Sequence, residues 1–219
     1  ALVVYLSTWS SWFLSDNGYS RHWAEDAGHA WGGLLSWVPL SVQSFWHFEA
    51  SVYSYHLGEM RPHGYQANPL TWLFMIRPTS MYYQSSSLGQ DGCQFTTCGA
   101  SITGIANPII WWAAVFALIH QVWRWLGRRD WRSGAVLVGV AAGWVPWLIY
   151  LDRTIFTFYT VVYVPFVVMA LSMSLGTVLG PSTASAKRRR DGSIAVGLFL
   201  LVVIAAAWWF YPIWTGEVI

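Results

Sequence analysis

Four apolar runs, each long enough to cross a membrane, dominate the sequence. They cover about 106–126, 134–151, 155–179 and 193–212, and a helix needs roughly 20 residues to span the hydrocarbon core. Charged residues make up 10% of the chain, against about 25% in an average soluble domain. Because so few charges cannot cover a water-facing surface, we predict an all-α polytopic membrane protein with about four full transmembrane helices. The same composition argues against a soluble enzyme, a disordered protein and a nucleic-acid binder.

Residues 1–14 are apolar but too short to span a membrane alone. They have neither an initiating methionine nor a basic flank, so they do not fit a signal peptide. We interpret them as the end of a fifth, truncated transmembrane helix, and we expect the N-terminal half of the same polypeptide to be missing. The remainder divides into an extracytoplasmic segment, 15–105, and a four-helix transmembrane region, 106–219.

Two basic clusters predict the topology. One comprises Arg124, Arg128, Arg129 and Arg132, and the other comprises Lys187, Arg188, Arg189 and Arg190. Together they hold eight of the twelve basic residues. The positive-inside rule makes both loops cytoplasmic, so the segment 15–105, the turn 151–154 and the C-terminus are expected outside. Binding of lipid head groups is the alternative role of the clusters.

The segment 15–105 is unusually apolar for an external loop. Residues 34–57 and 68–83 mix aromatic and apolar residues with Ser, Gln and His, so we predict two helices lying in the membrane interface. Such a roof suits an enzyme that handles a lipid-linked substrate, and it equally suits the gate of a transporter. No repeat of broken helices, which a transporter would favour, is found among the spans.

The cysteine and histidine residues of this segment give few signs of a metal site. Cys93 and Cys98 enclose a short loop in an oxidising compartment, so we predict a disulfide, with a metal pair as the alternative. Five of the six histidines lie here: His22, His29, His47, His56 and His63. Their spacing matches no metal motif, and we expect neither a metal nor a cofactor.

Two arginines, Arg77 and Arg153, lie on the predicted outer side near membrane depth. A guanidinium there is costly unless it is paired with an acid or bound to an anion. The first interpretation is an ion pair with a nearby carboxylate. The second is that Arg77 and Arg153 hold a lipid phosphate at the outer leaflet.

A series of short motifs resembles bacterial protein O-mannosyltransferases. The main motif is His63-Gly64-Tyr65-Gln66-Ala67-Asn68-Pro69-Leu70-Thr71-Trp72, followed by Arg77-Pro78. Before it stand Trp46-His47-Phe48 and His56; after it come Gly92-Cys93, Cys98, Asn107-Pro108, Trp111-Trp112, Arg129-Asp130-Trp131-Arg132, Gly143-Trp144, Pro146-Trp147, Asp152-Arg153, Phe158-Tyr159, Pro165-Phe166 and Tyr211-Pro212. Their order and spacing are similar to the C-terminal half of that family across nearly the whole chain.

The resemblance implies a glycosyltransferase of the GT-C class in the bacterial plasma membrane. Such an enzyme moves mannose from polyprenyl phosphate mannose, the donor, to Ser or Thr of an exported protein, the acceptor. On this basis Arg153 and Arg77 would bind phosphate, and the sugar or acceptor would lie near His63, Tyr65, Trp72 and Tyr159. Trp72 is alternatively a plain interfacial anchor.

The family's catalytic acidic pair lies in the N-terminal half, so no catalytic residue is assigned here. Glu49, Glu59 and Asp152 have no feature that distinguishes them from structural acids. Two other functions remain open: a non-catalytic subunit or scaffold of a cell-envelope complex, and a transferase that uses another sugar.

Overall fold

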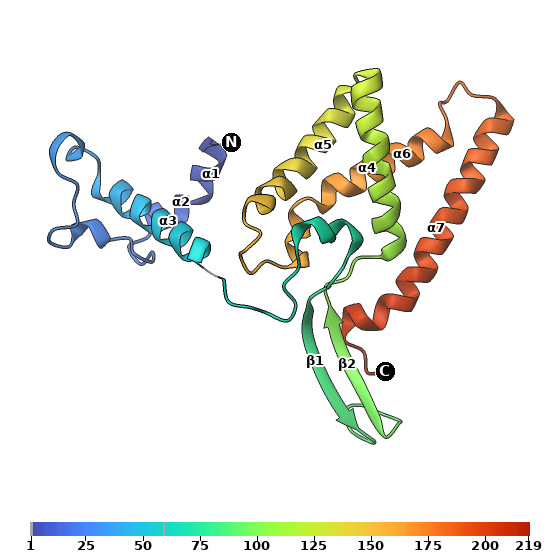
Figure 1. Cartoon of the computed structure of the whole chain (residues 1–219), viewed down its shortest axis with the longest axis horizontal. Helices are drawn as coiled ribbons and strands as arrows, with labels where there is room; N and C mark the ends of the chain where they lie inside the picture. Colours follow the sequence, from blue (N-terminus) through green and yellow to red (C-terminus); the bar gives the residue numbers. More distant parts are fainter. Residues whose placement is uncertain (1, 59) are drawn as a thin grey trace. The chain divides into compact units, whose positions relative to one another are not determined.

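The computed structural model describes residues 2–58 and 60–219 (Figure 1). The chain divides between Met60 and Arg61 into two compact units, and each is described by itself. Glu59, one of the acids considered above, lies outside the described residues.

The first unit is helical and rich in aromatic contacts. Its elements are α1 (Leu2–Thr8), α2 (Ser10–Leu14), the 3-10 turns η1 (Trp23–Glu25) and η2 (Gly33–Leu35), and α3 (Leu40–Gly58). The predicted helix over 1–14 is therefore interrupted, at Trp9. The helix predicted over 34–57 starts only at Leu40, because Pro39 disfavours helical backbone at the residue before it. Trp9 and Trp12 pack on Phe45, with ring centroids 5.3 and 5.5 Å apart.

The second unit contains the long apolar helices. They are α4 (Pro108–Arg128), α5 (Trp131–Trp144) continued by the 3-10 turn η4 (Val145–Ile149), α6 (Val164–Leu179) preceded by η5 (Thr157–Val162), and α7 (Ala186–Thr215). Within the described residues, Pro108–Arg128, Trp131–Ile149 and Ala186–Thr215 are long and apolar enough to cross a membrane. The chain is thus a multi-pass membrane protein, as predicted.

The fourth predicted span, 155–179, is not one continuous helix. It is the turn η5 followed by α6, whose 16 residues are fewer than the roughly 20 that a full span needs. Pro165 stands in the first turn of α6. Because proline donates no backbone hydrogen bond and clashes with the preceding turn, α6 cannot extend unbroken toward residue 155.

Helix α6 packs closely against α5 through glycines. A Cβ atom added to Gly143 would lie 2.9 Å from Cβ of Tyr163, and one added to Gly139 would lie 2.3 Å from the Phe166 ring. Small residues let membrane helices approach and gain dispersion contacts, since lipid supplies no hydrophobic drive between them. The core around this contact contains Trp111, Ala114, Ala117, Val136, Val140, Tyr163, Val167, Ala170 and Leu171.

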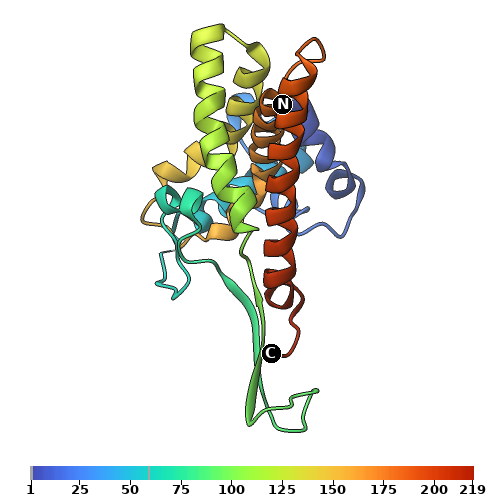
Figure 2. The same ribbon diagram turned by 90° about the vertical axis from the view of Figure 1, so that its right-hand side faces the viewer.

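A β-hairpin contradicts the all-α prediction. Strand β1 (Ser80–Ser87) pairs antiparallel with β2 (Thr97–Thr103), and Figure 2 shows the hairpin extending past the helix ends. The helix predicted over 68–83 is only the 3-10 turn η3 (Pro69–Phe74). Arg77 then adopts left-handed backbone, with φ 60°, and Pro78 disfavours helix at that residue.

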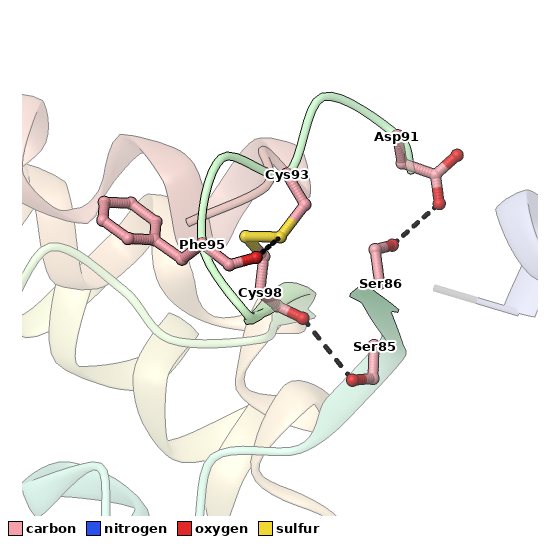
Figure 3. The surroundings of a disulfide bond; sticks show 6 residues. All are labelled: Ser85, Ser86, Asp91, Cys93, Phe95 and Cys98. Carbon is pink, nitrogen blue, oxygen red and sulfur yellow. Dashed lines mark hydrogen bonds between the residues drawn. A yellow bond between two sulfur atoms is a disulfide. The ribbon is translucent and has the colours of Figure 1, made fainter. Parts of the chain in front are cut away.

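Three sets of contacts hold the hairpin near its tip. Near its tip a disulfide joins Cys93 to Cys98, with the Cα atoms 5.7 Å apart (Figure 3). Beside it, the Ser86 hydroxyl donates to Asp91 Oδ2 at 2.7 Å. The C-terminal residue pairs with β2, since Gly99 and Ile219 exchange two backbone hydrogen bonds.

In the second unit, both basic clusters lie at the same end of the helices. The first basic cluster lies where α4 ends and α5 begins, and the second lies in the first turn of α7, just after α6. The opposite helix ends lead to the hairpin and to the turn 150–156 (Figure 1). We refer to these as the basic end and the hairpin end of the bundle.

Candidate functional site

The six binding residues predicted from the sequence lie in two segments at the hairpin end, 61–77 and 145–159. These segments are joined by hydrogen bonds. The Ala67 N–H donates to Ile155 O at 2.9 Å, and the Thr157 hydroxyl donates to Arg77 O at 2.9 Å. The Thr154 hydroxyl also donates to Arg61 O. Two stretches about 80 residues apart in sequence therefore form one surface.

Gln66 connects the positions of both arginines. Its backbone carbonyl accepts from Arg77 Nη1 at 3.3 Å, and its side-chain Nε2 donates to the backbone carbonyl of Arg153 at 3.3 Å. Arg77 is exposed, and the structure pairs it with no carboxylate among the described residues. The acid-pair interpretation of Arg77 therefore has no partner in the described part of the chain.

Arg153 lies against an aromatic row. Its guanidinium carbon is 5.7 Å from the centroid of the Trp147 ring, within the range of a cation–π contact. Trp147 in turn stacks on Tyr159, at 4.7 Å and 24° between ring planes. The backbone N–H of Arg153 donates to Tyr150 O at 3.2 Å, which closes the turn.

Trp72 forms the floor under this row. Its side chain is 0% exposed, its indole Nε1 donates to Ala67 O at 3.0 Å, and its ring meets Tyr159 edge-on at 6.3 Å. Because no face of the ring is open, this structure does not support the prediction that Trp72 stacks on a sugar. Two more indoles fix the same backbone: Trp144 donates to Pro69 O and Trp111 donates to Leu73 O, each at 2.9 Å.

His63 and Tyr65 occupy the open side of the site. Both are exposed, and their ring centroids are 5.9 Å apart. His63 also meets Phe156 edge-on at 5.1 Å, and Phe156 meets Tyr159 at 6.2 Å. The predicted residues are thus linked through Phe156, Trp147 and Gln66. We had assigned no binding role to these three, although Gln66 and Trp147 stand inside the motifs quoted above.

The other histidines and acids lie elsewhere. In the first unit, His47 stacks on Trp23 at 3.6 Å and His29 stacks on it at 4.4 Å. The Glu25 carboxylate, 2.7 Å from His22 Nδ1, raises the pKa of that imidazole. Glu49 belongs to α3, and Asp152 is exposed in the turn before Arg153. No group of three metal-ligating side chains is found in residues 2–58 and 60–219.

The hairpin-end site is therefore cationic and aromatic. Guanidinium groups suit phosphate, and exposed tyrosine and histidine offer both ring faces and hydrogen bonds to a polyol. In the described residues the site has no cluster of carboxylates that would act as a base. It is a candidate site for an anionic, sugar-bearing ligand.

Comparisons with known proteins show which sequences and structures this chain resembles. A family model described as the C-terminal four TMM region of protein-O-mannosyltransferase matches residues 41–219. Two relatives named polyprenol-phosphate-mannose–protein mannosyltransferase, from Mycobacterium tuberculosis (strain ATCC 25618 / H37Rv) and Mycolicibacterium smegmatis (strain ATCC 700084 / mc(2)155), are 35% and 33% identical over 98% of this chain. The chain spans only 41% and 42% of their lengths.

A solved structure shares the fold. It is the S. cerevisiae protein O-mannosyltransferase Pmt1-Pmt2 complex bound to the sugar donor, with a TM-score of 0.56 and 20% identity. The match covers 85% of this chain and 25% of the yeast chain.

Proposed function

The chain belongs to the protein O-mannosyltransferase family, and on that premise we propose that it forms the donor-binding C-terminal part of a membrane mannosyltransferase. The donor is polyprenyl phosphate mannose, and the acceptor is a Ser or Thr hydroxyl of an exported protein. One observation carries the proposal: the hydrogen bonds of Gln66 bring the segments of Arg77 and Arg153 together beside an aromatic row.

The reaction is a displacement at the anomeric carbon of mannose. The acceptor oxygen forms a bond to that carbon, the bond from the carbon to the phosphate oxygen breaks, and polyprenyl phosphate leaves. The configuration inverts, and the hydroxyl proton passes to a carboxylate base. Because negative charge develops on the leaving phosphate, fixed guanidinium donors stabilise the transition state more than the ground state.

Arg153 is the residue best placed to hold the leaving phosphate. It is half-buried, and the Trp147 ring and the turn 150–153 restrict its position. A guanidinium whose plane is fixed donates two parallel hydrogen bonds to a phosphate, which a lysine cannot reproduce. Arg77, exposed and held by Gln66 O, supplies the second cation.

The sugar and the acceptor lie on the open side, near His63, Tyr65 and Tyr159. His63 and Tyr65 are exposed, and Tyr159 is half-buried on the Trp72 floor. In this arrangement Trp72 positions Tyr159 and does not touch ligand. We assign no catalytic base to the described residues.

The hairpin end faces the extracytoplasmic side of a bacterial plasma membrane in this proposal. The eight clustered basic residues at the other end support that orientation, since basic residues favour the cytoplasmic side. The hairpin, the site and the C-terminus then share the side on which exported proteins emerge.

The test is transfer of labelled mannose from polyprenyl phosphate mannose to a Ser/Thr-rich peptide. Membranes from cells that express the complete reading frame are compared with membranes from matched cells that lack it. We expect gene-dependent labelling that Arg153→Ala abolishes and Arg153→Lys reduces at least tenfold, the equivalent of about 1.4 kcal/mol of lost transition-state stabilisation.

Arg190→Gln is the matched control, because Arg190 is exposed at the basic end and, among the described residues, its side chain pairs with the neighbouring Asp191 alone. Unchanged transfer by Arg153→Ala would refute the phosphate role. Absence of any gene-dependent labelling, with the protein folded and the donor intact, would refute mannose transfer. It would then favour another sugar, another lipid carrier or a non-catalytic subunit.

A further inference from the structure

A cationic hollow lies at the basic end of the bundle, away from the proposed donor site. Helices α4 and α6 line it with Trp123, Arg124, Arg128, Gly176 and Thr177, and Gly180 closes one side. Its volume is about 560 Å³. We call it the basic-end hollow, and nothing in the proposed transferase reaction uses it.

The hollow carries an excess of positive charge. Arg124 is paired with Asp130, at 2.5 Å, and its Nη1 donates to the Thr177 hydroxyl at 3.2 Å. Its buried Nε has no hydrogen-bond partner in the part of the chain that the structure describes. Arg128 has no carboxylate partner among the described residues; its guanidinium carbon lies 4.6 Å from the Trp123 ring centroid. Asp130 therefore neutralises one of two cations, and no acid of the described residues lines the hollow.

A buried polar network fixes the walls of the hollow. Gln121, 0% exposed on α4, donates to Ser174 Oγ on α6 at 2.9 Å and accepts from the Ser133 hydroxyl on α5 at 2.7 Å. His120 Nδ1 lies 2.9 Å from the same Ser174 oxygen. Because unpaired polar groups are costly in an apolar bundle, a satisfied network holds the three helices in one register. The distance between α4 and α6 at the hollow is thus preset.

The hollow is also open beside Gly176 of α6. A Cβ atom added to Gly176 would meet no atom within 4 Å. Beyond the helix end, Arg188 donates to the carbonyls of Val178, at 2.6 Å, and Thr177, at 3.3 Å. These bonds satisfy the last carbonyls of α6, so the helix terminus does not need a further partner. The space over Gly176 is therefore available to a ligand.

We propose that the basic-end hollow binds the phosphate group of an anionic phospholipid. The guanidinium groups of Arg124 and Arg128 provide donors for phosphate oxygens. The Thr177 hydroxyl donates to Met173 O at 3.1 Å and so holds the wall of the hollow without serving as a further donor. Trp123 and Met173, which also line the hollow, offer apolar surface to the glycerol and the first acyl carbons. A basic pocket between membrane-spanning helices at the cytoplasmic side is a common setting for anionic head groups. This inference concerns binding only and does not depend on the transfer reaction.

The test is a titration of phosphatidylglycerol against the delipidated protein, expressed from its complete reading frame and followed by native mass spectrometry. Arg128→Gln removes the cation that has no carboxylate partner among the described residues. Because charge-assisted hydrogen bonds are about twice as strong as neutral ones, we expect at least tenfold weaker binding. Arg128→Lys, which keeps the charge, should lose less. Gly176→Phe, which fills the hollow with its charge unchanged, should also weaken binding.

The matched control is Arg190→Gln, which removes an exposed arginine from the same end of the bundle. Its binding should change less than twofold. Equal losses in Arg128→Gln and Arg190→Gln would overturn the proposal in favour of diffuse charge attraction. Unaltered binding in Gly176→Phe would overturn the location. Displacement of the lipid by millimolar inorganic phosphate would identify free phosphate as the ligand and overturn the lipid assignment.

Discussion

Trp72→Phe separates a structural role for this side chain from a role in ligand stacking. The substitution keeps an aromatic ring but removes the indole N–H that donates to Ala67 O at 3.0 Å. The lost hydrogen bond costs about 1 kcal/mol. The cavity left at a side chain that is 0% exposed costs about 1–2 kcal/mol more. We expect a total loss of about 2–3 kcal/mol in the free energy of unfolding.

The assay is denaturant unfolding in detergent micelles, combined with donor-dependent transfer kinetics. Trp112→Phe is the matched control, because Trp112 is 50% exposed on α4, and its stability should change by less than about 0.5 kcal/mol. If Trp72 acts by positioning Tyr159, Trp72→Phe lowers the free energy of unfolding. Any rise in the apparent KM for the donor should then accompany that loss of stability. A higher donor KM with unchanged stability would refute the burial argument and restore the stacking interpretation.

Three further predictions follow from single contacts. Gln66→Ala removes the bond to the Arg153 carbonyl, so transfer should fall about tenfold while membrane insertion, followed by protease protection, stays unchanged. Gly192→Ala should cost about 1–3 kcal/mol of stability, because its Cβ would lie 2.4 Å from Val178 O; Gly197→Ala, with open space around it, should be neutral in the same unfolding assay. Burial raises the pKa of Asp130, but hydrogen bonds from the Arg132 N–H and the Arg124 guanidinium outweigh it and hold that pKa below its ordinary 3.8. The Arg124–Asp130 pair therefore stabilises the fold above pH 3.8, and this stabilisation is lost as the pH falls through the lowered pKa. In thermal unfolding measured at a series of pH values, Asp130→Asn should remove this loss of stability in acid.

The helices were predictable because the residues that form and end each of them lie within its own segment of the sequence. The apolar runs correctly indicated α4, α5 and α7, and Asn107-Pro108 marks the start of α4, where the Asn107 side chain accepts from two backbone N–H groups. The break in the predicted span 155–179 follows from Pro165, which stands in the first turn of α6 and prevents the helix from continuing toward residue 155. Local patterns thus indicated which segments are helical, with errors concentrated at prolines.

The hairpin was missed because its cause is not local. Residues 79–87 are rich in Ser and Tyr and carry no clear alternation. Their strand exists through pairing with Thr97–Thr103, through the disulfide beyond it and through the bonds between Gly99 and Ile219. Nothing within the segment 68–83 reveals such distant partners, and its aromatic residues suggested an interfacial helix instead.

Residue type was a better guide to the site than to the role of each side chain. The sequence pointed to Arg77 and Arg153 as costly cations, and the structure brings their segments together. The sequence could not show that Trp72 is buried, because residue type alone does not distinguish a buried tryptophan from one at the membrane interface. Nor could it show that Gln66 bridges two segments about 80 residues apart.

The position of the proposed donor site depends on how α5 and α6 end. Trp147 lies in the 3-10 continuation of α5, and Tyr159 lies in the 3-10 turn that precedes α6. The close approach of Gly143 to Tyr163 clamps these two helices just before the chain leaves them. Both ends of the turn 150–156 are thereby fixed, so Arg153 lies in a short loop whose position is defined. A binding site needs side chains held in such a defined position. Toward the basic end, the hydrogen bonds of Gln121 join α4 to α5 and α6. The same helices therefore support the proposed donor site at one end and the basic-end hollow at the other.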